Sequence, residues 1–185
     1  MYIRNWKTQI FTIPNALSML RILLIPVYIY FYWNATQPRD YYWAGAILAI
    51  SCLTDALDGI IARKFHMISS FGKILDPIAD KTTQLTLTLC LSLKFPVLIP
   101  VLTVLVIKEL CQIIGTLLLV RRGTAIPSAM LPGKICTAVL FISLITLVLF
   151  PNAPDIVVNT ISIVDSAFLM LAFVGYYFTF WRHRS

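Results

Sequence analysis

Four aspartates gather in a short stretch of an otherwise apolar chain. Asp55, Asp58, Asp76 and Asp80 all lie within the 26 residues from the first of them to the last. Carboxylates three or four positions apart project from one face of a helix, so two helices can bring all four acids to one point. Such a cluster predicts a site for divalent metal ions. Metal-assisted transfer of a phosphoryl-type group is the chemistry we expect there.

The cost of burying these acids supports the same interpretation. An ionised aspartate near the middle of a membrane helix costs roughly 2.5–3.5 kcal/mol, so four cost about 10 kcal/mol. Two hard dications such as Mg²⁺ would cancel the four negative charges and take the carboxylate oxygens as ligands. One carboxylate could then accept the proton of an attacking hydroxyl.

Composition indicates an all-α integral membrane protein. Of the 185 residues, 59% are apolar and 12% charged, and the mean hydropathy is +0.84. Six apolar stretches are long enough to cross about 30 Å of hydrocarbon. We place these spans, within a single domain covering residues 1–185, near 15–33, 42–65, 74–94, 97–119, 131–150 and 157–180. Because the third and fourth nearly touch, five spans and a re-entrant segment remain an alternative.

The N-terminal residues 1–13 are predicted to form a short amphipathic helix in the membrane interface. They combine Trp6 and Phe11 with cationic residues such as Arg4. A signal peptide is the weaker interpretation because Arg21 interrupts its would-be apolar core.

Positive charge is distributed unequally between the two sides of the predicted spans. One side receives only Arg39 and Lys94. The other receives ten cations: Arg4, Lys7, Arg63, Lys64, Lys73, Arg121, Arg122, Lys134, Arg182 and Arg184. Since positive loops stay in the cytoplasm, both termini and a polar cavity holding the four aspartates are expected on the cytoplasmic side. The net charge of +7 then belongs to a rim facing anionic lipid headgroups, and nucleic-acid binding is not expected.

The acids belong to a longer pattern of fixed spacing that includes small residues. Gly59 and Gly72 carry no side chain and would let a phosphate or nucleotide approach the backbone, or would simply allow close helix packing. Arg63 could hold a phosphate or anchor its helix at the interface. The full pattern is D-x-x-D-G-x-x-A-R-x8-G-x-x-x-D-x-x-x-D, formed by Asp55, Asp58, Gly59, Ala62, Arg63, Gly72, Asp76 and Asp80.

This pattern resembles the signature of the CDP-alcohol phosphotransferase family. Residues 13–21 (IPNALSMLR) and 74–81 (ILDPIADK) are similar to its bacterial phosphatidylglycerophosphate synthase branch. The resemblance implies a membrane-embedded homodimer in the bacterial plasma membrane. It also implies the activity of this family, which is to transfer the phosphatidyl group of CDP-diacylglycerol to a polar alcohol and release CMP, using two Mg²⁺ or Mn²⁺ ions.

The resemblance also implies roles for individual residues. Asp55, Asp58 and Asp76 would bind metal, and Asp80 would complete the metal site and act as general base. The CDP moiety would be held by Asn15, Arg21, Asp55, Asp58, Gly59, Ala62, Arg63 and Gly72.

The acceptor alcohol is less well defined by the sequence. The synthase branch usually carries arginines near positions 108 and 116, where this chain has Lys108 and Thr116. Lysine keeps the charge but lacks the planar fork that binds phosphate bidentately. The candidates for an acceptor phosphate site are Lys134, Lys108, Arg121 and Arg122, with Lys134 first. Glycerol 3-phosphate is the expected acceptor. Phosphatidylglycerol, as in a cardiolipin synthase, or another polar alcohol is the alternative.

Asp76 and two acids outside the cluster carry further expectations or open questions. Asp76 precedes Pro77 and is predicted to cap a helix that begins there. Glu109 is adjacent to Lys108, and side chains that diverge by about 100° on a helix are not expected to pair. No role is assigned to Asp165. An ion-coupled transporter is the rival class, but a relay needs acids spread across the membrane, whereas these four cluster at one depth.

Overall fold

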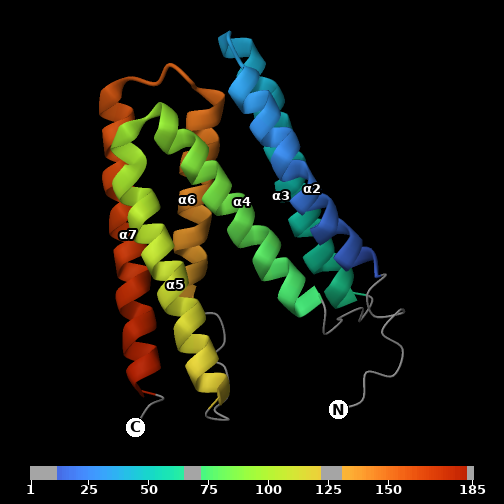
Figure 1. The fold of residues 1–185 in the computed structure, drawn as a ribbon, viewed down its shortest axis with the longest axis vertical. Coiled ribbons are helices and arrows are strands. Elements are labelled where there is room, and N and C mark those ends of the chain that lie inside the picture. Colours follow the sequence, from blue (N-terminus) through green and yellow to red (C-terminus); the bar gives the residue numbers. More distant parts are fainter. Residues whose placement is uncertain (1–11, 65–71, 122–130, 183–185) are drawn as a thin grey trace. The chain divides into compact units, whose positions relative to one another are not determined.

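The computed structural model describes residues 12–64, 72–121 and 131–182, and all regular structure in these ranges is helical. Residues 1–11, most of the predicted interfacial helix, lie outside the described residues. The helices are α2 (Ile13–Asn34), η1 (Pro38–Asp40), α3 (Tyr41–Lys64), α4 (Gly72–Lys94), η2 (Pro96–Leu98), α5 (Ile99–Arg121), α6 (Leu131–Leu149) and α7 (Asp155–Arg182) (Figure 1).

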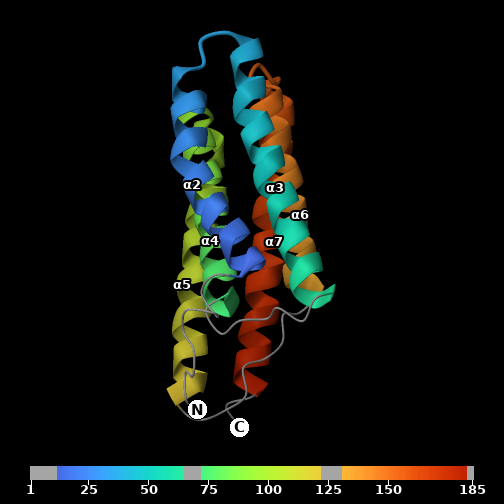
Figure 2. The same ribbon diagram turned by 90° about the vertical axis from the view of Figure 1, so that its right-hand side faces the viewer.

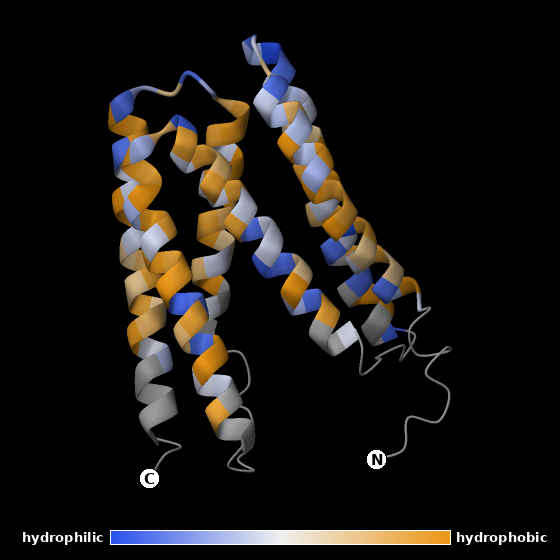
Figure 3. Cartoon of the chain, viewed as in Figure 1, coloured by the Kyte–Doolittle hydropathy of each residue, from blue (hydrophilic) through white to orange (hydrophobic). Residues whose placement is uncertain are grey.

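Each of the six predicted apolar stretches corresponds to one of the long helices, and the boundaries agree to within two residues. Three segments of the described chain are long and apolar enough to cross a membrane: Ile13–Asn34, Pro96–Thr116 and Asp155–Tyr176. The protein is therefore a multi-pass membrane protein. Hydrophilic residues interrupt the lower parts of α3 and α4 as drawn, while α5 to α7 are mostly hydrophobic (Figure 3). The count of six spans remains a prediction.

The chain divides into two compact units, residues 1–87 and 88–185. In the first unit, α2 and α3 pack along each other as an antiparallel hairpin with a short connection (Figure 2). Asp40 organises that connection, because its Oδ2 accepts hydrogen bonds from the backbone N–H groups of Gln37 and Thr36 at 2.8 and 3.0 Å. These bonds hold the pKa of Asp40 below its usual value, since they favour the charged form.

The start of α2 sets the position of a polar stripe on that helix. Thr12 is its N-cap, and its hydroxyl accepts a 3.4 Å hydrogen bond from the N–H of Asn15. Pro14 lies in the first turn, where its missing N–H costs nothing. From there Asn15, Ser18 and Arg21 recur every third residue, and all three are buried. A helix of strongly apolar composition thus presents a buried polar face within the first unit.

The start of α4 differs from the expectation. The helix begins at Gly72 and continues through Pro77, so Asp76 lies in its second turn and the predicted N-cap at Asp76 is wrong. The steric preference of a residue before proline is a bias. Here Asp76 is helical and makes a side-chain contact with α2 that is described below.

In the second unit, α7 packs against both α5 and α6. Leucines fill its core, with Leu105, Leu140, Leu144 and Leu169 almost fully buried. The Ser162 hydroxyl donates a 2.7 Å hydrogen bond to the carbonyl of Val97, which ties α7 to η2.

Candidate active site

Arg21 lies at the centre of the acidic cluster, and its side chain is only 2% exposed. Nη1 contacts Oδ1 of Asp55 at 2.7 Å and also Oδ1 of Asp80, while Nη2 contacts Oδ2 of Asp58 at 2.5 Å. One guanidinium from α2 thereby joins carboxylates from α3 and α4. Sequence spacing predicted that the acids would converge but not that a cation of the same chain would hold them.

Ser18, one turn before Arg21, links the fourth aspartate to the cluster. Its hydroxyl lies against Oδ1 of Asp76, 3.4 Å from Oδ2 of Asp58 and 3.0 Å from the carbonyl of Pro14. A hydroxyl has a single hydrogen to donate, so these oxygens share one donor. No role for Ser18 was predicted from the sequence. The three-residue spacing of Asn15, Ser18 and Arg21 was the signal that could have identified it.

The acids of the cluster differ in how far they are buried. The side chain of Asp58 is 6% exposed, whereas those of Asp55 and Asp80 are 51% and 46% exposed. The cluster is therefore covered at Asp58 and left uncovered by the described residues at Asp55 and Asp80.

The remaining predicted nucleotide-binding residues lie on nearby turns of the same helices. Gly59, Ala62 and Arg63 belong to the last two turns of α3, but the surroundings of Gly59 and the side chains of Ala62 and Arg63 lie outside the described part of the structure. Gly72 is buried at the first position of α4, and Asn15 is 1% exposed on the face of α2 that carries Arg21.

The donor set suits hard divalent cations. Four carboxylates and one guanidinium leave the cluster with three net negative charges, and their ligand atoms are oxygens, as Mg²⁺ and Mn²⁺ prefer. Among the described residues, no three His, Cys, Asp or Glu side chains are positioned to coordinate one metal ion. The carboxylates are instead arranged around the guanidinium. The chemistry of the donor set fits metal, and a bound ion would share these carboxylates with Arg21.

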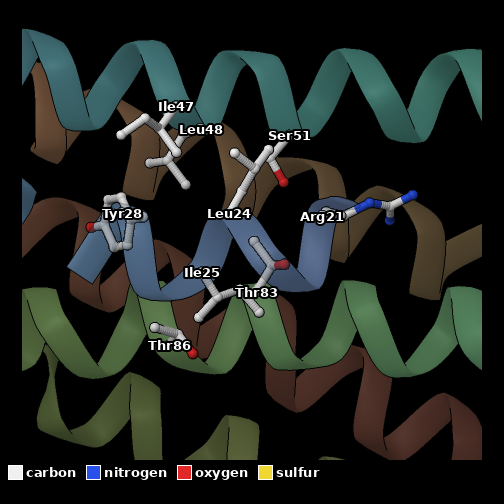
Figure 4. Close-up of a pocket in the computed structure, with 9 residues that line it drawn as sticks. All are labelled: Arg21, Leu24, Ile25, Tyr28, Ile47, Leu48, Ser51, Thr83 and Thr86. Atoms are coloured by element: carbon white, nitrogen blue, oxygen red, sulfur yellow. The ribbon is translucent and has the colours of Figure 1, made fainter. Parts of the chain in front are cut away.

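A cavity of about 10 Å³, room for about one water molecule, lies between α2, α3 and α4 beside Arg21 (Figure 4). Tyr28 lies at its other end, and Ser51, Thr83 and Thr86 are the hydroxyl-bearing residues of a lining that is mostly apolar. Arg21 thus separates the acidic cluster from a small apolar cavity inside the first unit.

The structure corrects the expectation for Lys108 and Glu109. Lys108 Nζ contacts Glu109 Oε1 at 2.6 Å, and both side chains are buried in the second unit. Although their Cβ directions diverge, two long side chains can bend toward each other, and an unpaired buried charge would cost more than that bend. Most of the positive charge of Lys108 is therefore compensated within its own helix.

Asp165, for which the sequence offered no partner, accepts a 3.0 Å hydrogen bond from the Ser143 hydroxyl through Oδ1. The residue is 1% exposed, and its Oδ2 has no hydrogen-bond partner among the described residues.

The other candidates for the acceptor phosphate site are placed only by their helices. Lys134 lies in the first turn of α6 and Arg121 is the last residue of α5, but their side chains lie outside the described part of the structure, as does the whole of Arg122.

Comparison with known sequences identifies the protein family of this chain. The sequence profile of the CDP-alcohol phosphatidyltransferase family matches residues 11–181. The chain belongs to this family. The match extends over both compact units and includes every predicted site residue, and it decides between enzyme and ion-coupled transporter in favour of the enzyme.

Three relatives illustrate the names found within this phosphatidyltransferase family. A probable phosphatidylglycerophosphate synthase of Mycobacterium tuberculosis is 30% identical over 91% of this chain and 80% of its own length. A CDP-diacylglycerol–glycerol-3-phosphate 3-phosphatidyltransferase of Rickettsia typhi is 48% identical over 37% of this chain and 38% of its own. A CMP-forming cardiolipin synthase of Streptomyces coelicolor is 32% identical over 70% of this chain and 61% of its own.

Proposed function

We propose that this phosphatidyltransferase uses CDP-diacylglycerol to phosphatidylate glycerol 3-phosphate, giving phosphatidylglycerophosphate and CMP. One observation carries the proposal: three aspartates of the family signature contact Arg21, the fourth is joined to them through Ser18, and Asp55 and Asp80 are about half exposed. The choice of glycerol 3-phosphate is supported by the Mycobacterium and Rickettsia relatives, whose names specify this product or this acceptor.

The chemistry assigned to the site is an in-line displacement at phosphorus. The acceptor hydroxyl oxygen attacks the phosphorus that carries the diacylglycerol, a new P–O bond forms, and the P–O bond to CMP breaks. Bound divalent cations would neutralise charge on the attacking and leaving oxygens, with Asp55, Asp58, Asp76 and Asp80 as their ligands.

Asp80 is the group to which we assign the proton of the acceptor hydroxyl. It is the half-exposed acid on α4, so a soluble alcohol can approach it. Asp58, nearly buried and held by both Arg21 and Ser18, suits a fixed ligand rather than a proton acceptor.

The same proposal includes the wider setting of the enzyme. We infer six spans, a homodimer, and a bacterial plasma membrane with both termini and the acidic cluster on the cytoplasmic side. The six long helices and the concentration of cations in one set of loops support the spans and their orientation. The homodimer and the bacterial plasma membrane rest on the resemblance to the synthase branch of the family. The CDP moiety would lie against the last turns of α3, near Gly59, Ala62 and Arg63, and against Gly72 at the start of α4.

A cardiolipin synthase that takes phosphatidylglycerol as acceptor is the second candidate. The ion pair of Lys108 with Glu109 favours it, because a lysine compensated in this way offers less attraction to an acceptor phosphate. The Streptomyces relative carries that activity in its name.

The deciding experiment is CMP release by the purified protein in detergent with Mg²⁺ and CDP-diacylglycerol. Glycerol 3-phosphate, phosphatidylglycerol, inositol phosphate and serine are offered in separate reactions. We expect CMP only with glycerol 3-phosphate. Release with phosphatidylglycerol alone would make the protein a cardiolipin synthase, and release with none would refute the proposed activity.

Lys134→Ala tests the acceptor side of the site. If Lys134 holds the acceptor phosphate, the KM for glycerol 3-phosphate should rise roughly tenfold or more, as for loss of a charge-assisted hydrogen bond, while the KM for CDP-diacylglycerol stays near its original value. Arg39→Ala, an exposed cation on η1, is the matched control and should change neither. A parallel rise in both KM values would make Lys134 a structural residue.

A further inference from the structure

We propose that Arg21 is a positioning residue for the acidic cluster. It acts as a built-in counter-cation that gathers three of the aspartates before metal binds and shares them with the metal afterwards. The inference rests on the proposed metal site and goes beyond it. The sequence resemblance places Arg21 with the nucleotide, whereas in the structure its guanidinium is engaged by carboxylates.

The first support is the way the contacts are divided among the oxygens. Arg21 uses Oδ1 of Asp55, Oδ2 of Asp58 and Oδ1 of Asp80, one oxygen from each acid. The second oxygen of each carboxylate lies outside these three contacts. A carboxylate can accept bonds on both oxygens, so a metal ion can begin to bind before the guanidinium releases its hold.

The second support is electrostatic. The guanidinium is buried, and a buried charge that loses its partner is costly. The converse also holds, because the carboxylates would repel one another and spread if no cation lay between them. Arg21 thus stabilises the meeting of α2, α3 and α4 in the state in which the acids are ready to accept metal.

The third support is the way the donors of Arg21 are used. Its Nε has no hydrogen-bond partner among the described residues, and the carboxylates meet the guanidinium through Nη1 and Nη2. Every ion pair that the structure describes for this buried cation is therefore with an acid that would bind metal. Ser18 adds a second link between Asp76 and Asp58.

If Arg21 and metal are alternative counter-cations, removing one makes the protein depend more on the other. The test measures the apparent melting temperature of the full-length protein in detergent, by helical circular dichroism, in EDTA and in saturating Mg²⁺. For Arg21→Gln we expect a fall of roughly 6–15 °C in EDTA, as for a broken buried ion pair in a chain of this size. In Mg²⁺ the fall should be less than half as large. The rise in melting temperature between EDTA and Mg²⁺, the metal-induced shift, is then larger for Arg21→Gln than for the unmodified protein.

Two further variants make this comparison specific. Lys108→Gln removes a buried cation that is paired with Glu109 in the second unit, and it should lower the melting temperature equally with and without Mg²⁺. Arg21→Lys keeps the charge but loses the fork, so its metal-induced shift should lie between those of Arg21→Gln and the unmodified protein. If Arg21→Gln does not fold, the metal-induced shift of Arg21→Lys is compared with that of the unmodified protein instead.

The outcomes separate this inference from the proposed function. An equal metal-induced shift in the unmodified protein and both Arg21 variants would make Arg21 a packing residue and overturn the inference alone. No metal-induced shift in any of them would contradict the proposed metal site and the inference together. A larger shift in Arg21→Gln, with an intermediate one in Arg21→Lys, supports both.

Discussion

Asp80→Asn is expected to lower kcat by about 10²–10⁴-fold, the range for loss of a general base, while CDP-diacylglycerol still binds. The amide keeps the size of the side chain and its contact with α2, but it cannot take the proton of the acceptor hydroxyl. The measurements are the rate of CMP release at saturating substrates and equilibrium binding of CDP-diacylglycerol to the purified variant.

Asp155→Asn is the matched control for this prediction. It makes the same chemical change at an exposed acid in the first turn of α7, and it should leave kcat close to that of the unmodified protein. Retained turnover in Asp80→Asn would remove Asp80 as the base. Loss of CDP-diacylglycerol binding would instead indicate that Asp80 acts mainly through the metals.

Removal of divalent cations should have an effect of similar size. We expect EDTA to reduce CMP release by at least about 10²-fold, because charge stabilisation by a metal ion is worth several kcal/mol in such transfers. Adding Mg²⁺ or Mn²⁺ in excess of the chelator should restore the rate.

Recovery of activity on adding metal is the control that separates chelation from denaturation. Circular dichroism in EDTA should show that the helices persist, since Arg21 still holds the acids together. Turnover that survives complete chelation would contradict a metal-dependent mechanism.

Much of the helical architecture could be predicted from composition and spacing. The long apolar runs gave the six helices to within two residues, because length and hydropathy are local properties of the chain. The placement of each acidic pair on one helix face also followed locally, since Asp55 and Asp58 are three apart and Asp76 and Asp80 are four apart. Local rules failed at Asp76, where a bias against helix before proline was overridden.

The sequence by itself determined which helices form, which residues are acidic and that one face of each of two helices carries the acids. The tertiary structure decided which partners those acids have. Arg21 is 34 residues from Asp55 and 59 from Asp80, and Lys108 pairs with its own neighbour. Such pairings depend on how helices pack and on side chains with several rotatable bonds. Burial then decides among them, because a charge removed from water must find whichever opposite charge the fold brings within reach.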